Sequence, residues 1–209
     1  TCNFPPKLYI FPEARRIMKS YADYILEAAF WYADHGFKIF QVNTQTKSPF
    51  EEGGFYNATV DKDIITDWFN IRPNAGLAIP TGMINGLFVL DVDERNGGFT
   101  TLKTMLETHN PFPIGPTVFT QNGGLHYYFK YPHFEFKTTK IPGGIDIKSD
   151  GGYVLIPPSA VANNRRYQWE PGKNLGKIPL PDAPEWLFEF LKREKVRQDD
   201  AWTLDGLIY

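Results

Sequence analysis

Three aspartates and one histidine of this chain have types and spacings that suit phosphoryl-transfer chemistry. Asp91 and Asp93 stand at the end of the apolar run that begins at residue 87. Alternate side chains of a strand point to the same face, so these two aspartates would share one face of a sheet. The same rule applies to two further predicted strands. One places His126 on a single face, and the other places Asp146 and Lys148 together on one face. If these faces converge, the chain gathers three carboxylates, an imidazole and an ammonium group.

Carboxylates gathered in this way need cations beside them. Mutual repulsion would protonate bare carboxylates at neutral pH unless positive charge neutralises them. Carboxylate oxygens suit the hard ions Mg²⁺ and Mn²⁺. Two such ions about 3.5–4 Å apart can bind both the attacking and the leaving oxygen of an in-line phosphoryl displacement. His126 and Lys148 would then contact a triphosphate, and Gly123 and Gly124 would let backbone N–H groups approach its phosphates closely.

Each of these residues has a simpler interpretation when it is taken alone. An Asp-x-Asp pair can be a solvated strand end, and a lysine such as Lys148 is solvated by default. A single histidine in a hairpin is more often structural than catalytic, and Gly123-Gly124 is explained equally well by a turn. The position of Asp91 and Asp93 favours function, because site residues of α/β sheets commonly follow the ends of apolar strands. Only the ordered combination is informative.

The elements that would position these residues mix helix and strand without a regular period. Apolar periodicity and capping residues predict helices over residues 13–35, from a cap at Thr59 or Asp61 to Phe69, over 99–108 and over 184–195. The same patterns predict strands over residues 37–42, 75–80, 87–92, 117–121, 125–131, 145–149, 153–156 and 167–169. Turn residues at 122–124 and 150–152 predict two β-hairpins. We therefore expect a mixed α/β fold of the α+β class rather than a doubly wound sheet.

Composition bounds the class of protein. The 209 residues are 42% hydrophobic with a formal net charge of −2, which suits a globular domain and gives no global argument for nucleic-acid binding. Cys2 is the single cysteine, which excludes an intrachain disulfide and favours a reducing, cytoplasmic setting. No apolar run approaches the roughly 18 residues of a membrane span, and no signal-peptide pattern is present. Because the sequence starts at Thr1 rather than at Met, we expect a processed or excised segment.

The order of these motifs resembles the N-terminal domain of bifunctional DNA primase/polymerases, within the archaeo-eukaryotic primase superfamily. The resemblance runs from about Tyr21 to Leu191. Its features in chain order are Lys47-Ser48-Pro49, Ala58-Thr59-x-Asp61, residues 74–82, Val89-Leu90-Asp91-Val92-Asp93, Gly97-Gly98, Thr120-x-x-Gly123-Gly124-x-His126, Gly144-Ile145-Asp146-Ile147-Lys148, Gly151-Gly152-Tyr153-Val154, Pro157-Pro158-Ser159 and Tyr167-x-Trp169. So long an ordered series is specific.

The resemblance implies a role for each matching residue. Asp91, Asp93 and Asp146 match the family's catalytic, metal-binding carboxylates, and His126 matches its nucleotide-contacting histidine. Lys148 stands where the family has a basic residue near the phosphates of the incoming nucleotide. Weaker candidates for phosphate or template contacts are Lys47, Ser159 and Arg165 or Arg166. For the first two of these, a loop lysine beside a proline and a capping serine are the simpler interpretations.

The resemblance also implies a single catalytic domain over residues 1–209, with two sheet-containing lobes and a cleft between them. The implied activity is template-directed nucleotidyl transfer from dNTPs or rNTPs, on single-stranded DNA or a primer-template, with two Mg²⁺ or Mn²⁺ ions. No zinc is expected, because Cys2 and the four histidines do not form a ligand-spaced cluster. A fused or separate helicase or accessory domain is the expected protein partner, so the resemblance implies a domain excised from a longer replication protein. No membrane is expected.

Two alternatives stay open from the sequence. A metal-dependent nuclease or phosphodiesterase could use the same carboxylates, although His126, Lys148 and the turn at 122–124 favour a triphosphate pocket. A non-catalytic nucleic-acid-binding replication module could use the aromatic residues to stack on bases. The presence of every acidic site position argues against the binding module.

Overall fold

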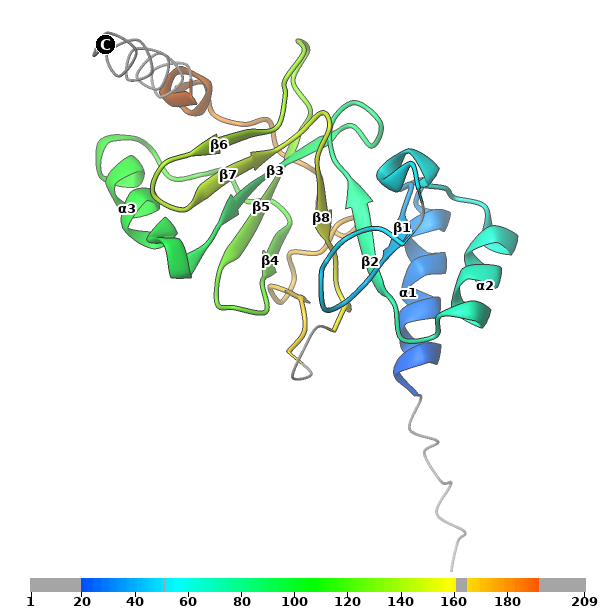
Figure 1. Cartoon of the computed structure of the whole chain (residues 1–209). Coiled ribbons are helices and arrows are strands. Elements are labelled where there is room, and N and C mark those ends of the chain that lie inside the picture. The colour runs from blue at the N-terminus through cyan, green and yellow to red at the C-terminus, as the bar shows by residue number, and fades with distance from the viewer. Residues whose placement is uncertain (1–19, 51, 161–164, 192–209) are drawn as a thin grey trace, which may run out of the picture.

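Two antiparallel sheets lie side by side between two groups of helices (Figure 1). The computed structural model describes residues 20–50, 52–160 and 165–191. Within these ranges the fold is mixed α+β, as the sequence predicts, with one three-stranded and one six-stranded sheet. Across the same ranges, no helix combines the length and the apolar character that crossing a membrane requires.

The N-terminal helices cover the outer side of the smaller sheet (Figure 1). α1 (Tyr21–Asp34) begins at a capping box in which Ser20 and Asp23 exchange hydrogen bonds. α2 (Lys62–Ile71) begins at Asp61, whose carboxylate accepts two backbone hydrogen bonds of the first turn. Both helices supply buried side chains to the core cluster that includes the smaller sheet, so their capped first turns are fixed against it.

The smaller sheet has the strand order β1-β2-β8. Its strands are β1 (Phe40–Val42), β2 (Gly76–Pro80) and β8 (Tyr153–Leu155). Both neighbours run antiparallel to β2, and every residue of β2 is buried. β2 is therefore a central strand covered on both faces, which explains its continuous apolar composition. The 3₁₀ turn η1 (Gly54–Asn57) lies in the connection from this sheet to α2.

The larger sheet has the strand order β6-β7-β3-β5-β4-β9, and its neighbouring strands are antiparallel. Its strands are β3 (Leu87–Val92), β4 (Thr117–Phe119), β5 (Leu125–Lys130), β6 (Thr139–Ile141), β7 (Ile145–Lys148) and β9 (Gln168–Trp169). The 3₁₀ turn η2 (Glu94–Asn96) leads from β3 into α3 (Gly98–Thr108). α3 and the helical residues 185–191 pack against one face of this sheet.

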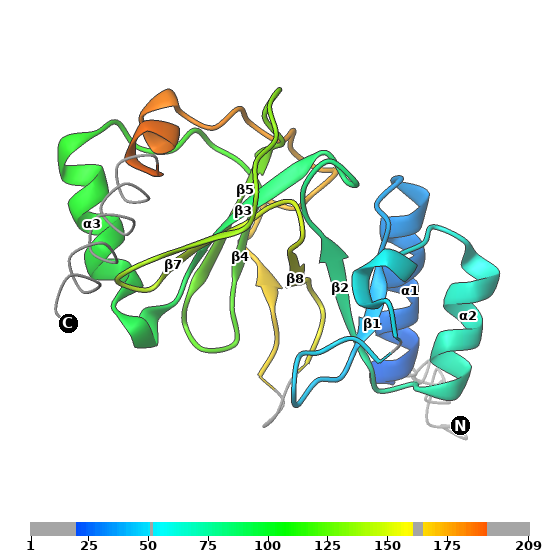
Figure 2. The same cartoon turned by 45° about the horizontal axis from the view of Figure 1, so that its top comes forward.

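β3 is covered on both faces, because the smaller sheet lies on one side and α3 on the other (Figure 2). Leu87 and Val89 belong to the core shared with the smaller sheet. Phe88 and Leu90 belong to the core against α3. Asp91 is the next residue on the inner face, so the apolar core between the sheets ends at this carboxylate.

One predicted hairpin is wrong. The turn at 150–152 does not fold the chain back along β7, because β8 pairs with β2 of the other sheet. β7 instead forms its hairpin with β6, around the turn at 142–144. Turn residues show where a strand ends but not which edge the next strand joins, and the buried Val154 fits beside the buried β2. Gly82 permits the crossing, since a Cβ there would lie 2.8 Å from the backbone of Asp150.

The other predicted elements differ from the structure mainly at their ends. The hairpin around residues 122–124 is confirmed by the β4–β5 pairing. β1 covers residues 40–42 rather than 37–42, because Ile39 makes only an isolated bridge to Thr59. Residues 13–19 of the first predicted helix and 192–195 of the last lie outside the described ranges.

Ser159 ties the segment after β8 to β2, and its loss should destabilise the fold. The fully buried Ser159 hydroxyl donates to the Leu77 carbonyl at 3.0 Å and accepts from the Leu77 N–H at 2.8 Å. Ser159→Ala leaves a buried N–H without this acceptor. We therefore expect the free energy of unfolding in urea to fall by about 1–3 kcal/mol.

Thr66→Ala is the matched control for this prediction. The exposed Thr66 hydroxyl donates to the Lys62 carbonyl within α2, at 2.7 Å. Its removal should change the free energy of unfolding by no more than about 0.5 kcal/mol. Equal stabilities of the two variants would contradict the assigned role of Ser159.

Candidate active site

Asp91 lies directly between two other predicted site residues. On the central strand β3 it is paired with His126 of β5 on one side and with Asp146 of β7 on the other. Lys148 is two residues further along β7 and shares the face of Asp146. Neighbouring strands are about 4.7–4.9 Å apart, so the register places these side chains within reach of one another.

Asp91 and Asp146 each have a basic neighbour on the same sheet. His126 Nε2 lies 3.4 Å from Asp91 Oδ1, a pair that is ionic only when the imidazole is protonated. Lys148 Nζ donates to Asp146 Oδ2 at 2.7 Å. The protein itself therefore supplies part of the positive charge that a carboxylate cluster needs.

Asp93 also has a structural role, as the N-cap of η2. Its carboxylate accepts hydrogen bonds from the Arg95 N–H at 3.1 Å and from the Asn96 side-chain amide at 2.8 Å, and the Arg95 guanidinium lies 3.3 Å away. Burial acts to raise the pKa of Asp93, but the contacts with Arg95 and Asn96 outweigh it and hold that pKa below its usual value. Asp93 is thus an anion, and the hydrogen-bond and ion-pair partners described for it belong to η2, the turn that it caps.

Asp91 borders two adjacent hollows in the surface. The inter-sheet hollow, of about 390 Å³, takes residues of both sheets and has basic and aromatic side chains, among them Lys47, His126, Lys148, Tyr153 and Tyr167. The carboxylate hollow, of about 460 Å³, has acidic and polar side chains, among them Asp93, Asn96, Lys140 and Asp146. Both volumes fall within the roughly 300–1,000 Å³ of small-molecule sites. The shared wall at Asp91 thus separates a basic compartment from an acidic one.

Asp91 remains charged although its side chain is only 27% exposed. Burial acts to raise the pKa of this carboxyl, but His126, Lys148 and Lys47 outweigh it and hold the pKa below its usual value. The group is therefore an anion at neutral pH before any ligand binds, and it faces cationic groups of the chain.

Lys47 is held at the inter-sheet hollow by an uncommon backbone conformation. Its φ is +61°, in the left-handed region that residues other than glycine rarely adopt. The Lys47 N–H donates to the Asn43 carbonyl at 2.7 Å, and the Tyr153 hydroxyl donates to the Lys47 carbonyl at 3.1 Å. Lys47 Nζ lies 5.9 Å from the centre of the Tyr167 ring. Burial and the charge of Arg95 lower the pKa of Lys47. Backbone strain of this kind clusters at functional sites, and a phosphate contact of Lys47 stays a prediction.

A left-handed backbone explains why Gly123 is glycine, and close packing explains why Gly124 is glycine. A Cβ on Gly124 would collide with the Val92 carbonyl, whereas a Cβ on Gly123 would meet only the flexible end of the Glu94 side chain. Gly123 has a φ of +85°. Neither glycine is among the residues that line the two hollows. Their contact with phosphate stays a prediction.

Ser159 and Arg165 are not among the residues that line the two hollows, although the Ser159 carbonyl accepts a hydrogen bond from the N–H of the lining residue Tyr167 at 3.0 Å. The Ser159 hydroxyl is committed to the backbone of Leu77, which gives it a structural role. Arg165 is exposed at the start of the last described range. Its neighbour Arg166 packs over the Tyr21 ring at 5.1 Å. A template contact of Arg165 stays a prediction.

Sequence reasoning did not select Tyr153, Tyr167 or Arg95, which all lie at the site. The two tyrosines line the inter-sheet hollow, and burial raises the pKa of Tyr167, so its phenol is neutral. Arg95 contacts Asp93 from two residues away. Their sequence signals are weak, because an aromatic residue on a short strand is ordinarily core and an arginine in a loop is ordinarily solvated.

The carboxylate hollow has the donor chemistry that a hard divalent cation prefers. Asp91, Asp93 and Asp146 all line it, and carboxylate oxygens suit Mg²⁺ or Mn²⁺. Among the residues that the structure describes, however, no three acidic, histidine or cysteine side chains converge as a metal-binding group. Asp146 and Asp93 instead direct oxygens to Lys148 and Arg95. A cation would therefore have to displace these basic partners.

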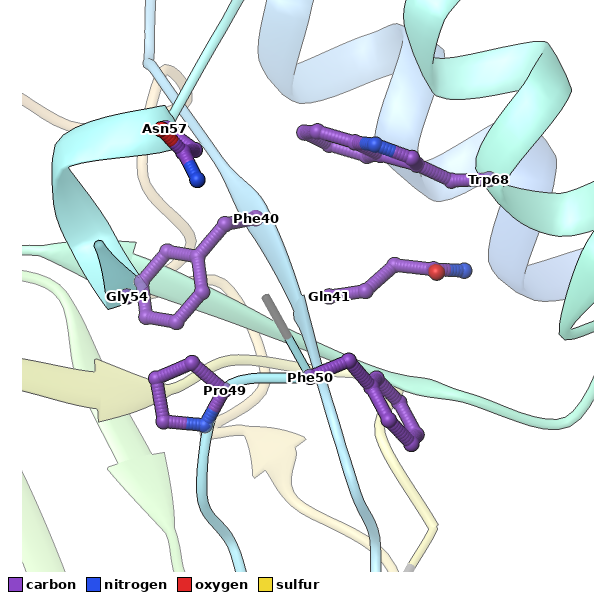
Figure 3. A pocket seen from close by; sticks show the side chains of 7 residues that line it. All are labelled: Phe40, Gln41, Pro49, Phe50, Gly54, Asn57 and Trp68. Atoms are coloured by element: carbon purple, nitrogen blue, oxygen red, sulfur yellow. The ribbon is translucent and has the colours of Figure 1, made fainter. Parts of the chain in front are cut away.

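A small cavity between β1 and α2 is too small for a nucleotide (Figure 3). Its volume of about 10 Å³ is close to the minimum for one water molecule. Figure 3 shows Gln41 reaching from β1 toward α2, where its amide nitrogen donates to the Arg72 carbonyl at 3.4 Å. This cavity is a packing feature of the core, and the two hollows at Asp91 hold the candidate site.

Comparison with known proteins identifies the family of the chain. The chain matches the family model described as bifunctional DNA primase/polymerase, N-terminal, over residues 29–186. That range covers more than half of the chain and includes Asp91, Asp93, His126, Asp146 and Lys148. No curated protein matches the chain significantly.

Removing one carboxylate from the acidic hollow should weaken the binding of a divalent ion. We expect Mn²⁺ to raise the Tm of the chain, because a ligand that binds only the folded state stabilises it, by about 2.7 kcal/mol at 100 times its Kd. Asp91→Asn and Asp146→Asn should each shift the midpoint of this stabilisation to higher Mn²⁺ concentration. Thermal unfolding across a Mn²⁺ titration measures the effect.

Asp182→Asn is the control for this titration. Asp182 is 83% exposed and lies 3.7 Å from Lys130, away from both hollows. Its substitution should leave the Mn²⁺ response unchanged. A response like that of the unsubstituted chain in both Asp91→Asn and Asp146→Asn would remove these carboxylates from the metal site.

Proposed function

Because this chain belongs to the bifunctional DNA primase/polymerase N-terminal family, a family of nucleotidyltransferases, we propose that it adds nucleotides to a nucleic-acid chain at the site around Asp91. The reaction forms a bond between a chain-terminal 3′-hydroxyl oxygen and the α-phosphorus of a (d)NTP, and it releases pyrophosphate. One observation carries the proposal: Asp91 borders both the basic inter-sheet hollow and the carboxylate hollow. A triphosphate needs the first, and its metal counter-ions need the second.

The inter-sheet hollow is the proposed triphosphate site. Lys47 and Lys148 bring ammonium groups to it, and such charges form strong hydrogen bonds with phosphate oxygens. His126 borders the same hollow, but its side chain is only 5% exposed and its Nε2 faces Asp91. We therefore assign His126 a double role, in orienting Asp91 and in contacting the nucleotide.

The carboxylate hollow is the proposed metal site. Asp91, Asp93 and Asp146 would hold Mg²⁺ or Mn²⁺ there. When bound, such ions neutralise the charge of the reacting phosphoryl group and polarise it. Asp93 would release part of its contact with Arg95, and the guanidinium would stay beside the hollow as a further cation.

We further propose that the two sheets are the two lobes of a primase-like catalytic core, with the inter-sheet hollow as the cleft between them. β8 contributes to one wall of this hollow, and β3, β5 and β7 contribute to the other. A single-stranded DNA template or a primer-template would enter along this hollow. The carboxylates at its end would then meet the 3′ end of the growing strand.

The decisive experiment incubates a labelled primer-template with the chain and Mn²⁺, with and without dNTPs. Lengthening that requires dNTPs is the expected result. Shortening without dNTPs would instead identify a nuclease, which could use the same carboxylates. Binding with neither outcome would identify a non-catalytic module.

Asp91→Asn should abolish primer extension while it leaves the fold intact, because the amide keeps the size of the carboxylate but loses its charge. Asp93→Asn should also abolish extension if Asp93 ligates metal. Because asparagine caps helices as well as aspartate does, retained activity of Asp93→Asn would assign Asp93 to capping alone. Asp182→Asn again serves as the control, and extension by Asp91→Asn near the unsubstituted rate would remove the central proposal.

His126→Ala should lower kcat/KM for the incoming nucleotide roughly ten- to a hundred-fold, because a hydrogen bond to a charged group contributes about 1.5–3 kcal/mol. Steady-state incorporation on one primer-template, across dNTP concentrations, measures it. A rise in KM would support contact with the nucleotide. A fall in kcat at constant KM would support orientation of Asp91, and unchanged kinetics would leave His126 purely structural.

A further inference from the structure

A row of aromatic rings leads out of the inter-sheet hollow to the protein surface. Tyr153 lines the hollow, and its ring centroid is 6.4 Å from that of Phe55. The Phe55 centroid is in turn 4.5 Å from that of Tyr56, with an angle of 34° between the ring planes. Tyr56 is 78% exposed, so the row ends in solvent.

The inner rings of this row are held in place by the surrounding structure. Phe55 packs against the core between the sheets and the N-terminal helices. The Tyr153 ring packs edge-on against Phe40, at 5.3 Å. The turn η1 is closed by the hydrogen bond from the Tyr56 N–H to the Gly53 carbonyl at 3.0 Å, and Gly53 has a φ of +88°. Tyr56 is therefore presented to solvent from an ordered turn.

Neither core packing nor charge explains the position of Tyr56. A single exposed tyrosine is ordinary, but this one continues a series of rings that begins in the proposed nucleotide site. Lys47 supplies positive charge to the hollow, whereas the exposed Glu52 lies on the same loop as η1. The acidic Glu52 beside η1 does not attract phosphate, so a ligand there would be held mainly by the rings of Phe55 and Tyr56.

We propose that Phe55 and Tyr56 form a stacking platform for the single-stranded DNA template, beside the nucleotide site. This inference rests on the proposed function, which requires an unpaired template strand next to the incoming nucleotide. Every base offers a flat π face to an aromatic ring, so a platform of this kind binds without sequence preference. Continuity with the inter-sheet hollow through Tyr153 gives the strand a path into the site.

Tyr56→Ala should weaken binding of a fluorescent oligothymidylate roughly five- to a hundred-fold, measured by fluorescence anisotropy. Tyr56→Phe and Tyr56→Trp should retain binding, whereas Tyr56→Leu should lose it, because leucine keeps apolar area without a π face. Tyr24→Ala is the control, since Tyr24 is 49% exposed on α1, away from the hollow. Its affinity for the oligonucleotide should be unchanged.

Salt dependence separates stacking from phosphate contact. Loss of a phosphate contact lowers the slope of log Kd against log salt, whereas loss of stacking shifts the line without changing its slope. We therefore expect parallel lines for Tyr56→Ala and the unsubstituted chain. A reduced slope, an unchanged affinity, or full binding by Tyr56→Leu would each overturn the platform.

The proposal can fail independently of the proposed function. Anisotropy requires no catalysis, so an unsubstituted chain that does not extend primers would overturn the function while the binding result still judges the platform. In an extending chain, an effect of Tyr56→Ala confined to the KM for dNTP would assign the ring to the incoming base, and would overturn its role in template binding.

Discussion

The site depends on one constraint: β3 is buried on both faces, yet its inner face ends in the carboxylate of Asp91, which has to stay charged. Leu87 and Val89 precede Asp91 on the inner face and lie in the apolar core. An anion at this depth is costly unless opposite charge lies close by. Lys148 on one flanking strand supplies that charge, and His126 on the other adds to it when its imidazole is protonated. A register shift of one residue would turn Asp91 toward α3, so the pairing of three strands is as much a requirement of the site as the residues themselves.

The basic partners of the aspartates also suggest how the site exchanges its charges. Without ligand, Lys148 balances Asp146 and Arg95 balances Asp93. A divalent ion bound by the carboxylates would release these two cations. A triphosphate brings negative charge at the same moment, so the released groups would turn to its oxygens. Binding of metal and binding of nucleotide would then favour each other. The metal ion would free Lys148 and Arg95, and the negative charge of the triphosphate would neutralise these freed cations.

The parts of the structure that sequence could predict are those set by local periodicity. The faces of Asp91, His126 and Asp146 follow from strand alternation alone, and the structure places these residues in register. The pairing of β8 with β2 could not be predicted, because it depends on how two buried layers meet rather than on the turn between β7 and β8. Local periodicity also could not place Lys47, which only the family resemblance selected, since the Tyr153 hydroxyl that holds its carbonyl is 106 residues away in the chain.

The inter-sheet hollow is continuous with the core between the sheets and lies where their side chains cease to meet. On β3 the inner face changes from Val89 to Asp91, and on β5 it changes from the buried Tyr128 to His126. Val89 is paired with Tyr128, and Asp91 is paired with His126. The two strands therefore change from core residues to polar residues at the same level, and the core between the sheets ends along that line. Beyond that line, β3 and β5 present Asp91 and His126 to the hollow, whereas β8 of the smaller sheet presents Val154 and Leu155. A bound nucleotide would occupy that place, so its binding would strengthen the association of the two sheets as well as present its phosphates to the carboxylates.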